Sequence, residues 1–103
     1  MRQEIYEKIS GIKKRLEPEG FIIIGVFGSV ARGDETVTSD VDVLYELHEP
    51  FISRYRGWAV FGRIEAIKKE IEIDLGMEVD LANKDALDEV GKRFILPEVV
   101  HVA

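Results

Sequence analysis

Two short stretches of the sequence carry residues whose types and spacing suit a metal-bound triphosphate. Gly28 and Ser29 close an apolar run, and after ten intervening residues Asp40 and Asp42 open a second one. Because side chains alternate across a strand, the two aspartates are expected on the same face. Two neighbouring carboxylates repel each other unless a cation lies between them, and Mg²⁺ prefers oxygen ligands. The pair therefore indicates a magnesium site.

A third carboxylate, Asp80, follows in an alternating segment at 77–81, on the face opposite the apolar side chains. We expect the strand at 21–27 to be central, with the other two strands beside it, so that Asp80 joins Asp40 and Asp42. Three carboxylates around one point are costly without cations. The cluster therefore predicts a site for two metal ions.

The Gly-Ser turn is the expected binding place of the phosphates. Gly28 permits a tight turn, and the helical turn after it directs unpaired N–H groups toward an anion. The Ser29 hydroxyl is expected to donate to a phosphate oxygen. Arg32 either reaches the phosphates or pairs with a nearby carboxylate, and Ser39 either orients Asp40 or closes the loop.

Hydrophobic periodicity predicts the elements that position these residues. The segments are helices at about 2–16 and 58–76, strands at 21–27, 41–47 and 77–81, a last helix at about 84–92 capped by Asn83, and an edge strand or a frayed end at 99–102. Residues 51–57 show no clear period. The order predicts an α/β (α+β) fold in a single domain spanning residues 1–103, with a small mixed sheet, helices packed on one face and an open face carrying the carboxylates.

Composition restricts the classes of partner. The chain has 103 residues, no cysteine and a net charge of −6. Extended nucleic acids are usually bound by basic surfaces, so direct binding of long nucleic acid is not expected. The sequence shows neither a signal peptide nor a membrane-spanning run, and the absence of cysteine is compatible with a reducing compartment. We therefore expect a cytoplasmic protein without a membrane partner.

The pattern Gly-Ser, ten residues, Asp-x-Asp resembles the nucleotidyltransferases of the DNA polymerase beta superfamily, and at this length the chain looks most like the minimal nucleotidyltransferases. The resemblance implies the nucleotidyltransferase fold and two Mg²⁺ ions. Asp40 and Asp42 would hold the ion on the triphosphate of ATP or another NTP, and Asp80 would join them at the second ion, which activates the acceptor hydroxyl. Many members carry an arginine directly after the serine, where this chain has Val30, so that contact is absent or made by Arg32.

Minimal nucleotidyltransferases are typically antitoxins of a HEPN-domain protein, so the resemblance implies such a partner in a hetero-oligomer. The leading hypothesis is Mg²⁺-dependent transfer of a nucleoside monophosphate, AMP from ATP, to a hydroxyl of that partner. One alternative is an antitoxin that neutralises the HEPN protein by binding alone. Another is transfer to a small molecule.

Overall fold

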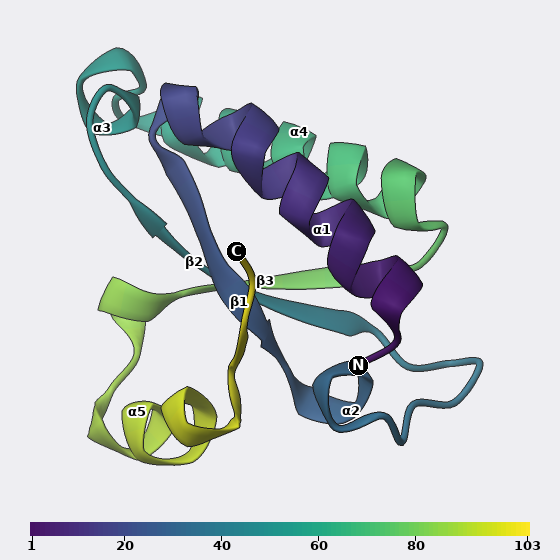
Figure 1. Cartoon of the computed structure of the whole chain (residues 1–103). Coiled ribbons are helices and arrows are strands. Elements are labelled where there is room, and N and C mark those ends of the chain that lie inside the picture. Colours follow the sequence, from purple (N-terminus) through teal and green to yellow (C-terminus); the bar gives the residue numbers. More distant parts are fainter.

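The structure, a computed structural model, describes residues 1–103 as a mixed four-stranded sheet with helices (Figure 1). This confirms the predicted fold class. In chain order the helices and strands are α1 (Gln3–Leu16), β1 (Phe21–Phe27), α2 (Gly28–Arg32), β2 (Val41–Leu47), α3 (Phe51–Arg54), α4 (Trp58–Leu75), β3 (Val79–Asn83), α5 (Glu89–Ile95) and β4 (Val100–His101). Short 3₁₀ turns occupy Glu17–Glu19, Lys84–Ala86 and Leu96–Glu98. None of the helices combines the length and apolar composition needed to cross a bilayer.

The strand order is β3-β2-β1-β4, which corrects the expected arrangement. β1 pairs antiparallel with β2 and with β4, whereas β3 pairs parallel with β2 and does not touch β1. The predicted edge strand at the end of the chain forms as β4 and occupies the second side of β1. β3 therefore lies at the free side of β2, to which the long crossover through α3 and α4 returns the chain.

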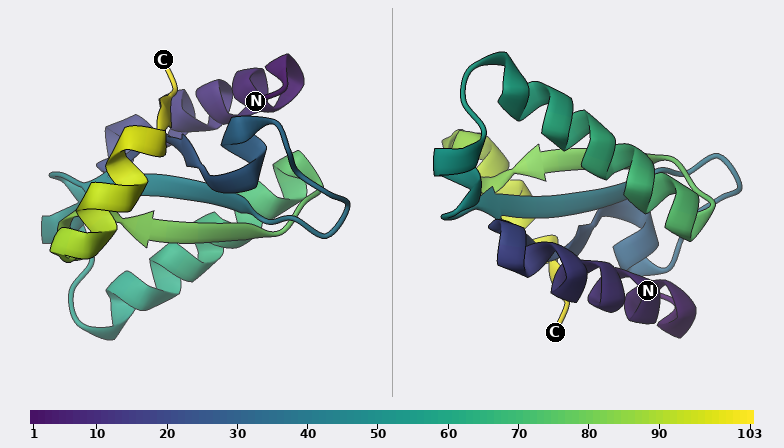
Figure 2. Two further views of the ribbon diagram at one scale, coloured as in Figure 1. Left: turned by 90° about the horizontal axis from the view of Figure 1, so that it is seen from below. Right: turned by 90° about the horizontal axis from the view of Figure 1, so that it is seen from above.

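α1 and α4 cover one face of the sheet (Figures 1 and 2). α1 buries Ile5, Ile9, Ile12 and Leu16, the stripe expected from helical spacing. α4 buries Ile67 and Ile71 and ends at Gly76, whose φ of +67° gives the left-handed C-cap that the sequence predicted. These two helices enclose the main hydrophobic core.

α5 lies on the other face of the sheet, opposite α1 and α4 in both views of Figure 2, which corrects the expectation that the helices pack on one face. Leu44 is fully buried although its neighbours Val43 and Tyr45 supply the core on the first face. The second face is therefore covered in its middle by the C-terminal segment. It stays open at the start of β2 and β3, where Asp80 is exposed and Asp42 is half-buried.

Three boundaries differ from the predicted ones. β3 begins at Val79, two residues later than expected. Asn83 does act as a cap, but its side chain accepts from the Asp85 amide of a 3₁₀ turn, and the last helix starts at Glu89 with Asp88 as its cap. The segment without clear periodicity contains α3, whose Phe51 is fully buried and packs against the Phe21 ring.

Candidate active site

The turn between β1 and α2 forms one side of the candidate site. β1 ends at Phe27 and α2 starts at Gly28, whose φ is +77°. A Cβ atom at Gly28 would lie 2.2 Å from the Asp42 Oδ2 atom. The left-handed backbone favours glycine, and any side chain there would displace the Asp42 carboxylate. The turn is packed directly against a carboxylate that the sequence assigned to metal binding.

Asp42 and Asp80 are register partners in the parallel pair of β2 and β3. Partners in a parallel ladder project to the same face, so the two carboxylates meet on the open face. Asp42 is also the register partner of Phe27, the residue before the Gly-Ser turn. The corrected strand order thus brings the turn, Asp42 and Asp80 together more directly than the expected arrangement, because β2 lies between the other two segments.

The electrostatics of Asp42 show that the carboxylates act on one another. Burial raises the pKa of the Asp42 carboxyl, and the nearby charges of Asp80 and Asp40 raise it further. Arg32 acts in the opposite direction, and Glu98 adds a smaller upward effect. The ionised form of Asp42 is therefore less favoured than that of an ordinary aspartate, an effect that a bound cation would offset.

The donor set fits Mg²⁺, since Asp40, Asp42 and Asp80 offer only carboxylate oxygens. As the side chains stand, no three acidic, histidine or cysteine side chains are gathered closely enough to hold one ion. The open position of Asp80 and the half-buried positions of Asp40 and Asp42 leave the three carboxylates accessible to a ligand. These are the residues that would hold the ions.

Arg32 is paired with two carboxylates. Its Nη1 lies 2.6 Å from Glu98 Oε1 and its Nε lies 3.3 Å from Asp34 Oδ2. Hydrogen bonds to Glu98 and Asp34 raise the pKa of Arg32 above its usual value. Of the two roles that the sequence left open, the structure shows carboxylate pairing. Ser29, in the first turn of α2, is half-buried.

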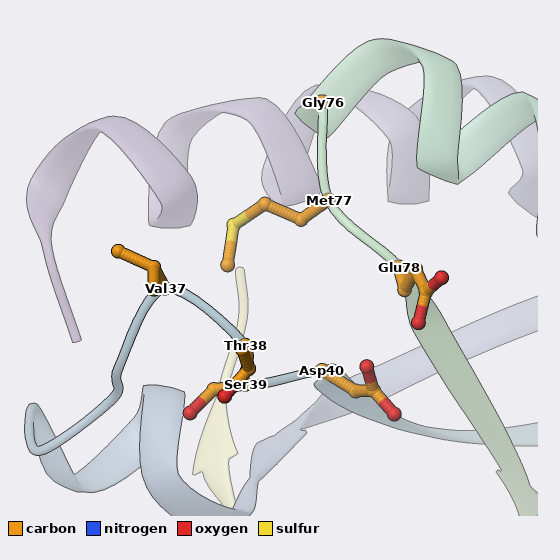
Figure 3. A pocket seen from close by; sticks show the side chains of 7 residues that line it. All are labelled: Val37, Thr38, Ser39, Asp40, Gly76, Met77 and Glu78. Carbon is orange, nitrogen blue, oxygen red and sulfur yellow. The ribbon is translucent and has the colours of Figure 1, made fainter.

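Ser39 closes the loop before β2. The Thr36 amide donates to Ser39 Oγ at 2.9 Å, and the Ser39 amide donates to the Thr36 carbonyl at 3.1 Å. The Ser39 and Asp40 side chains point in different directions (Figure 3). Of its two expected roles, loop closure is the one for which the structure supplies contacts.

An open pocket of about 410 Å³ lies at the same edge of the sheet (Figure 3). Its lining comes from the loop before β2 and from the connection between α4 and β3: Val37, Thr38, Ser39, Asp40, Gly76, Met77 and Glu78. Of the predicted site residues it contains Asp40 and Ser39, whereas Asp42, Asp80, Gly28, Ser29 and Arg32 lie outside it. The pocket therefore adjoins the carboxylates without enclosing them.

Two acidic residues near the site were not predicted as members of it. Glu78 stands two residues before Asp80 and lines the pocket with Asp40; its signal was the strand alternation that places it on the face of Asp80. Glu98 reaches Arg32 from the 3₁₀ turn after α5. No sequence signal marks Glu98, because only the folded chain brings it to α2.

The chain matches the family model of the nucleotidyltransferase domain over residues 6–100. The protein adenylyltransferase MntA of Thermococcus cleftensis is 36% identical over 102 residues, which cover 97% of this chain and 94% of that relative. A protein of Methanocaldococcus jannaschii, provisionally named a protein adenylyltransferase, is 33% identical over 98 residues. The alignment covers 91% of this chain and 97% of that relative.

Two solved structures share the fold. One, provisionally described as a minimal nucleotidyltransferase, aligns with a TM-score of 0.73 at 26% identity and covers 99% of this chain and 97% of its own. The other, a toxin–antitoxin crystal structure with AMP-PNP, has a TM-score of 0.58 at 21% identity over 82% of this chain and 61% of its own, and shows likeness of fold alone. With the family match and the relatives aligned over nearly their whole length, the chain belongs to the nucleotidyltransferase domain family and is a nucleotidyltransferase.

Proposed function

We propose that this protein transfers AMP from ATP to a hydroxyl group of a partner protein, with Mg²⁺ as the cofactor. The observation that carries the proposal is the register pairing of Asp42 with Asp80 beside the Gly28 turn, which joins an anion-binding helix start to paired carboxylates. The names of the two aligned relatives support protein as the acceptor. The acidic chain, with a net charge of −6, suits a nucleotide delivered with a cation.

The proposed mechanism gives each site residue a separate role. The Gly28 turn and the Ser29 hydroxyl hold the triphosphate, and Asp40, Asp42 and Asp80 hold the metal. Mg²⁺ held by these carboxylates would lower the pKa of the acceptor hydroxyl and offset the charge of the phosphates. We assign the hydroxyl proton to Asp80, the exposed member of the three.

The transfer exchanges one phosphorus–oxygen bond for another. The acceptor oxygen forms a bond to the α-phosphorus, and the bond from the α-phosphorus to the oxygen bridging to the β-phosphate breaks, so pyrophosphate leaves. The proton of the hydroxyl passes to Asp80. Arg32 is paired with Glu98 and Asp34 through Nη1 and Nε, which leaves the Nη2 donors for a phosphate.

The proposed acceptor is a HEPN-domain protein, for which this chain acts as antitoxin. The resemblance to minimal nucleotidyltransferases supports this partner class. The fold shared with a component of a toxin–antitoxin complex is consistent with it.

Labelled ATP tests the proposal. The purified protein is incubated with α-labelled ATP, Mg²⁺ and the product of the adjacent gene as the candidate partner, and label is followed on a denaturing gel. We expect label on the partner with the wild type and none with Asp42→Asn. The matched control is Asp85→Asn, an exposed aspartate just beyond the opposite end of β3, which should label the partner normally. Equal labelling by wild type and Asp42→Asn would contradict the proposal.

A second candidate, neutralisation by binding alone, is favoured by one observation. No three acidic side chains are gathered closely enough for an ion as the side chains stand. Under this alternative, Asp40→Asn and Asp42→Asn proteins still suppress the toxicity of the partner in cells. Under the catalytic proposal both variants lose suppression while they still form the complex.

A further inference from the structure

α5 carries two large apolar side chains that face solvent. Val90 and Phe94 are 64% and 66% exposed. They stand four residues apart and are therefore neighbours on one side of the helix. Gly91 and Ile95, on the side toward the rest of the chain, are half-buried. The exposed pair is thus a second apolar stripe that the fold leaves uncovered.

This stripe belongs to the face of the sheet that carries the candidate active site. α5 lies opposite α1 and α4 in both views of Figure 2, on the face to which Asp42 and Asp80 project. The helix leads directly into the Leu96–Glu98 turn, where Glu98 binds Arg32 at 2.6 Å. A protein seated on α5 would therefore lie on the same face of the sheet as the carboxylates and not behind it.

Unpaired basic side chains on α5 indicate the charge of a segment that could bind the apolar stripe. Arg93, three residues after Val90, borders the stripe and makes no ion pair, although the chain has 20 acidic residues against 14 basic ones. Lys92 is likewise unpaired on the same helix. Arg93 thus places a positive charge beside the apolar stripe, on the face of the sheet that also carries the site carboxylates. This arrangement favours a segment that carries a carboxylate at one end and a neutral hydroxyl at the other.

We propose that Val90, Arg93 and Phe94 form the docking surface for the acceptor protein, through a segment in which apolar side chains and a carboxylate accompany the acceptor hydroxyl. The inference rests on the proposed function, since it assumes a protein acceptor. A hydroxyl can reach Asp80 only from the open face of the sheet, and the apolar pair of α5 lies on that face. Contact at α5 fixes the segment while its hydroxyl approaches the α-phosphorus.

The other exposed aromatic group supplies a matched control. Trp58 and Phe61 are 87% and 65% exposed on α4, with ring centroids 5.8 Å apart. Phe61 therefore equals Phe94 in residue type and exposure, but it belongs to the helix layer on the opposite face. A protein held at α4 would not present a hydroxyl to Asp80 of the same chain.

The test measures binding of the HEPN-domain protein by calorimetry. Phe94→Ala is expected to weaken binding about tenfold or more, as central aromatic contacts do, and Phe61→Ala to leave it unchanged. Arg93→Ala should lower the association rate and reduce its dependence on salt. Circular dichroism checks that each variant is folded, which the exposure of both phenylalanines favours. Weakening by Phe61→Ala and not by Phe94→Ala would overturn the inference, as would failure of the wild type to bind.

A second measurement separates the docking surface from the chemistry. The Phe94→Ala protein should keep the full rise in melting temperature that Mg²⁺ and ATP give the wild type, and should need more partner for half-maximal labelling, with the rate at saturation unchanged. If no protein is labelled yet Phe94→Ala still weakens the complex, the docking surface stands and the transfer proposal fails. Equal half-maximal concentrations for Phe94→Ala and wild type would overturn the docking surface alone.

Discussion

Replacing Gly28 with alanine is expected to lower the transfer rate far more than its modest cost in fold stability would explain. In Gly28→Ala the new Cβ would lie 2.2 Å from Asp42 Oδ2 and 3.2 Å from its Cγ. Contacts under 3.0 Å are not sustained, so the carboxylate must retreat by about 0.8 Å. The carboxylate is the end of a movable side chain and can turn away. The substitution therefore displaces the group on which the proposed chemistry depends.

Two contributions set the magnitude. The φ of +77° costs an alanine about 1–2 kcal/mol, and turning Asp42 off its preferred rotamer adds about 0.5–1.5 kcal/mol. The free energy of unfolding should therefore fall by about 1.5–3.5 kcal/mol. A misplacement of about 1 Å at a reacting centre can cost about 10²-fold in rate. We expect the transfer rate of folded Gly28→Ala to fall by about that factor.

Gly33→Ala is the matched control, because Gly33 has a φ of +81° but no atom lies within 4 Å of the place that an added Cβ would take. It should lose only about 1–2 kcal/mol and keep its transfer rate within a few-fold. Urea unfolding measures the stabilities, and labelled ATP with the partner protein measures transfer. In an Asp42→Ala background the nearest remaining Asp42 atom is its Cβ at 3.7 Å, so Gly28→Ala should cost no more than Gly33→Ala. Additive costs of Gly28→Ala and Asp42→Ala, or equal transfer by Gly28→Ala and Gly33→Ala, would refute the reasoning.

Three further outcomes test the electrostatics and packing around this centre. In metal-free buffer Asp42→Asn should raise the melting temperature at pH 7, because burial and nearby carboxylates raise the pKa of Asp42. The neutral form of Asp42 stabilises the fold fully below the ordinary pKa of 3.8, and this stabilisation is lost as the pH rises through the raised pKa. The difference in melting temperature between Asp42→Asn and the wild type should therefore vanish at low pH. Arg63→Ala removes half-buried hydrogen bonds of 2.5 and 2.7 Å to Glu19 and should cost about 1–3 kcal/mol in urea. Since Arg63 lowers the pKa of Glu19, that contribution is present above the ordinary carboxyl pKa and should disappear as the pH falls through the lowered one. Gly25→Ala would place a Cβ 2.3 Å from the Val100 carbonyl oxygen, so it should cost about 1–3 kcal/mol and speed amide exchange in β4.

Local periodicity was sufficient to predict the elements that carry the site. The alternation after Asp40 and the apolar run before Gly28 placed β2 and β1 at their observed positions, since each pattern depends only on neighbouring residues. The predicted strand order was wrong because the position of β3 depends on which sheet edge is unpaired when the chain returns through α3 and α4. β4 blocks one side of β1, and its two residues gave too weak a signal to decide this in advance.

The start of the last helix shows a competition between two caps. Asn83 and Asp88 both have side chains that accept from a nearby amide, at 2.9 Å from Asp85 and 2.7 Å from Gly91. Both caps form, but only the second is followed by a continuous helix. Residue preferences do not distinguish a cap over a single turn from a cap over a helix, because the difference lies in the packing of the residues that follow.

The role of Arg32 could not be decided from the sequence because its partner is distant along the chain. Glu98 is 66 residues away and reaches Arg32 only when the turn after α5 lies against α2. A triphosphate bound by Arg32 would therefore share the guanidinium with Glu98 and Asp34, whose contacts use Nη1 and Nε and leave Nη2 free. The same turn joins Arg32 to α5, so a partner seated on Val90 and Phe94 would contact the segment that holds Glu98 in place. On the two proposals together, docking of the acceptor would be felt at Arg32 through the Arg32–Glu98 ion pair.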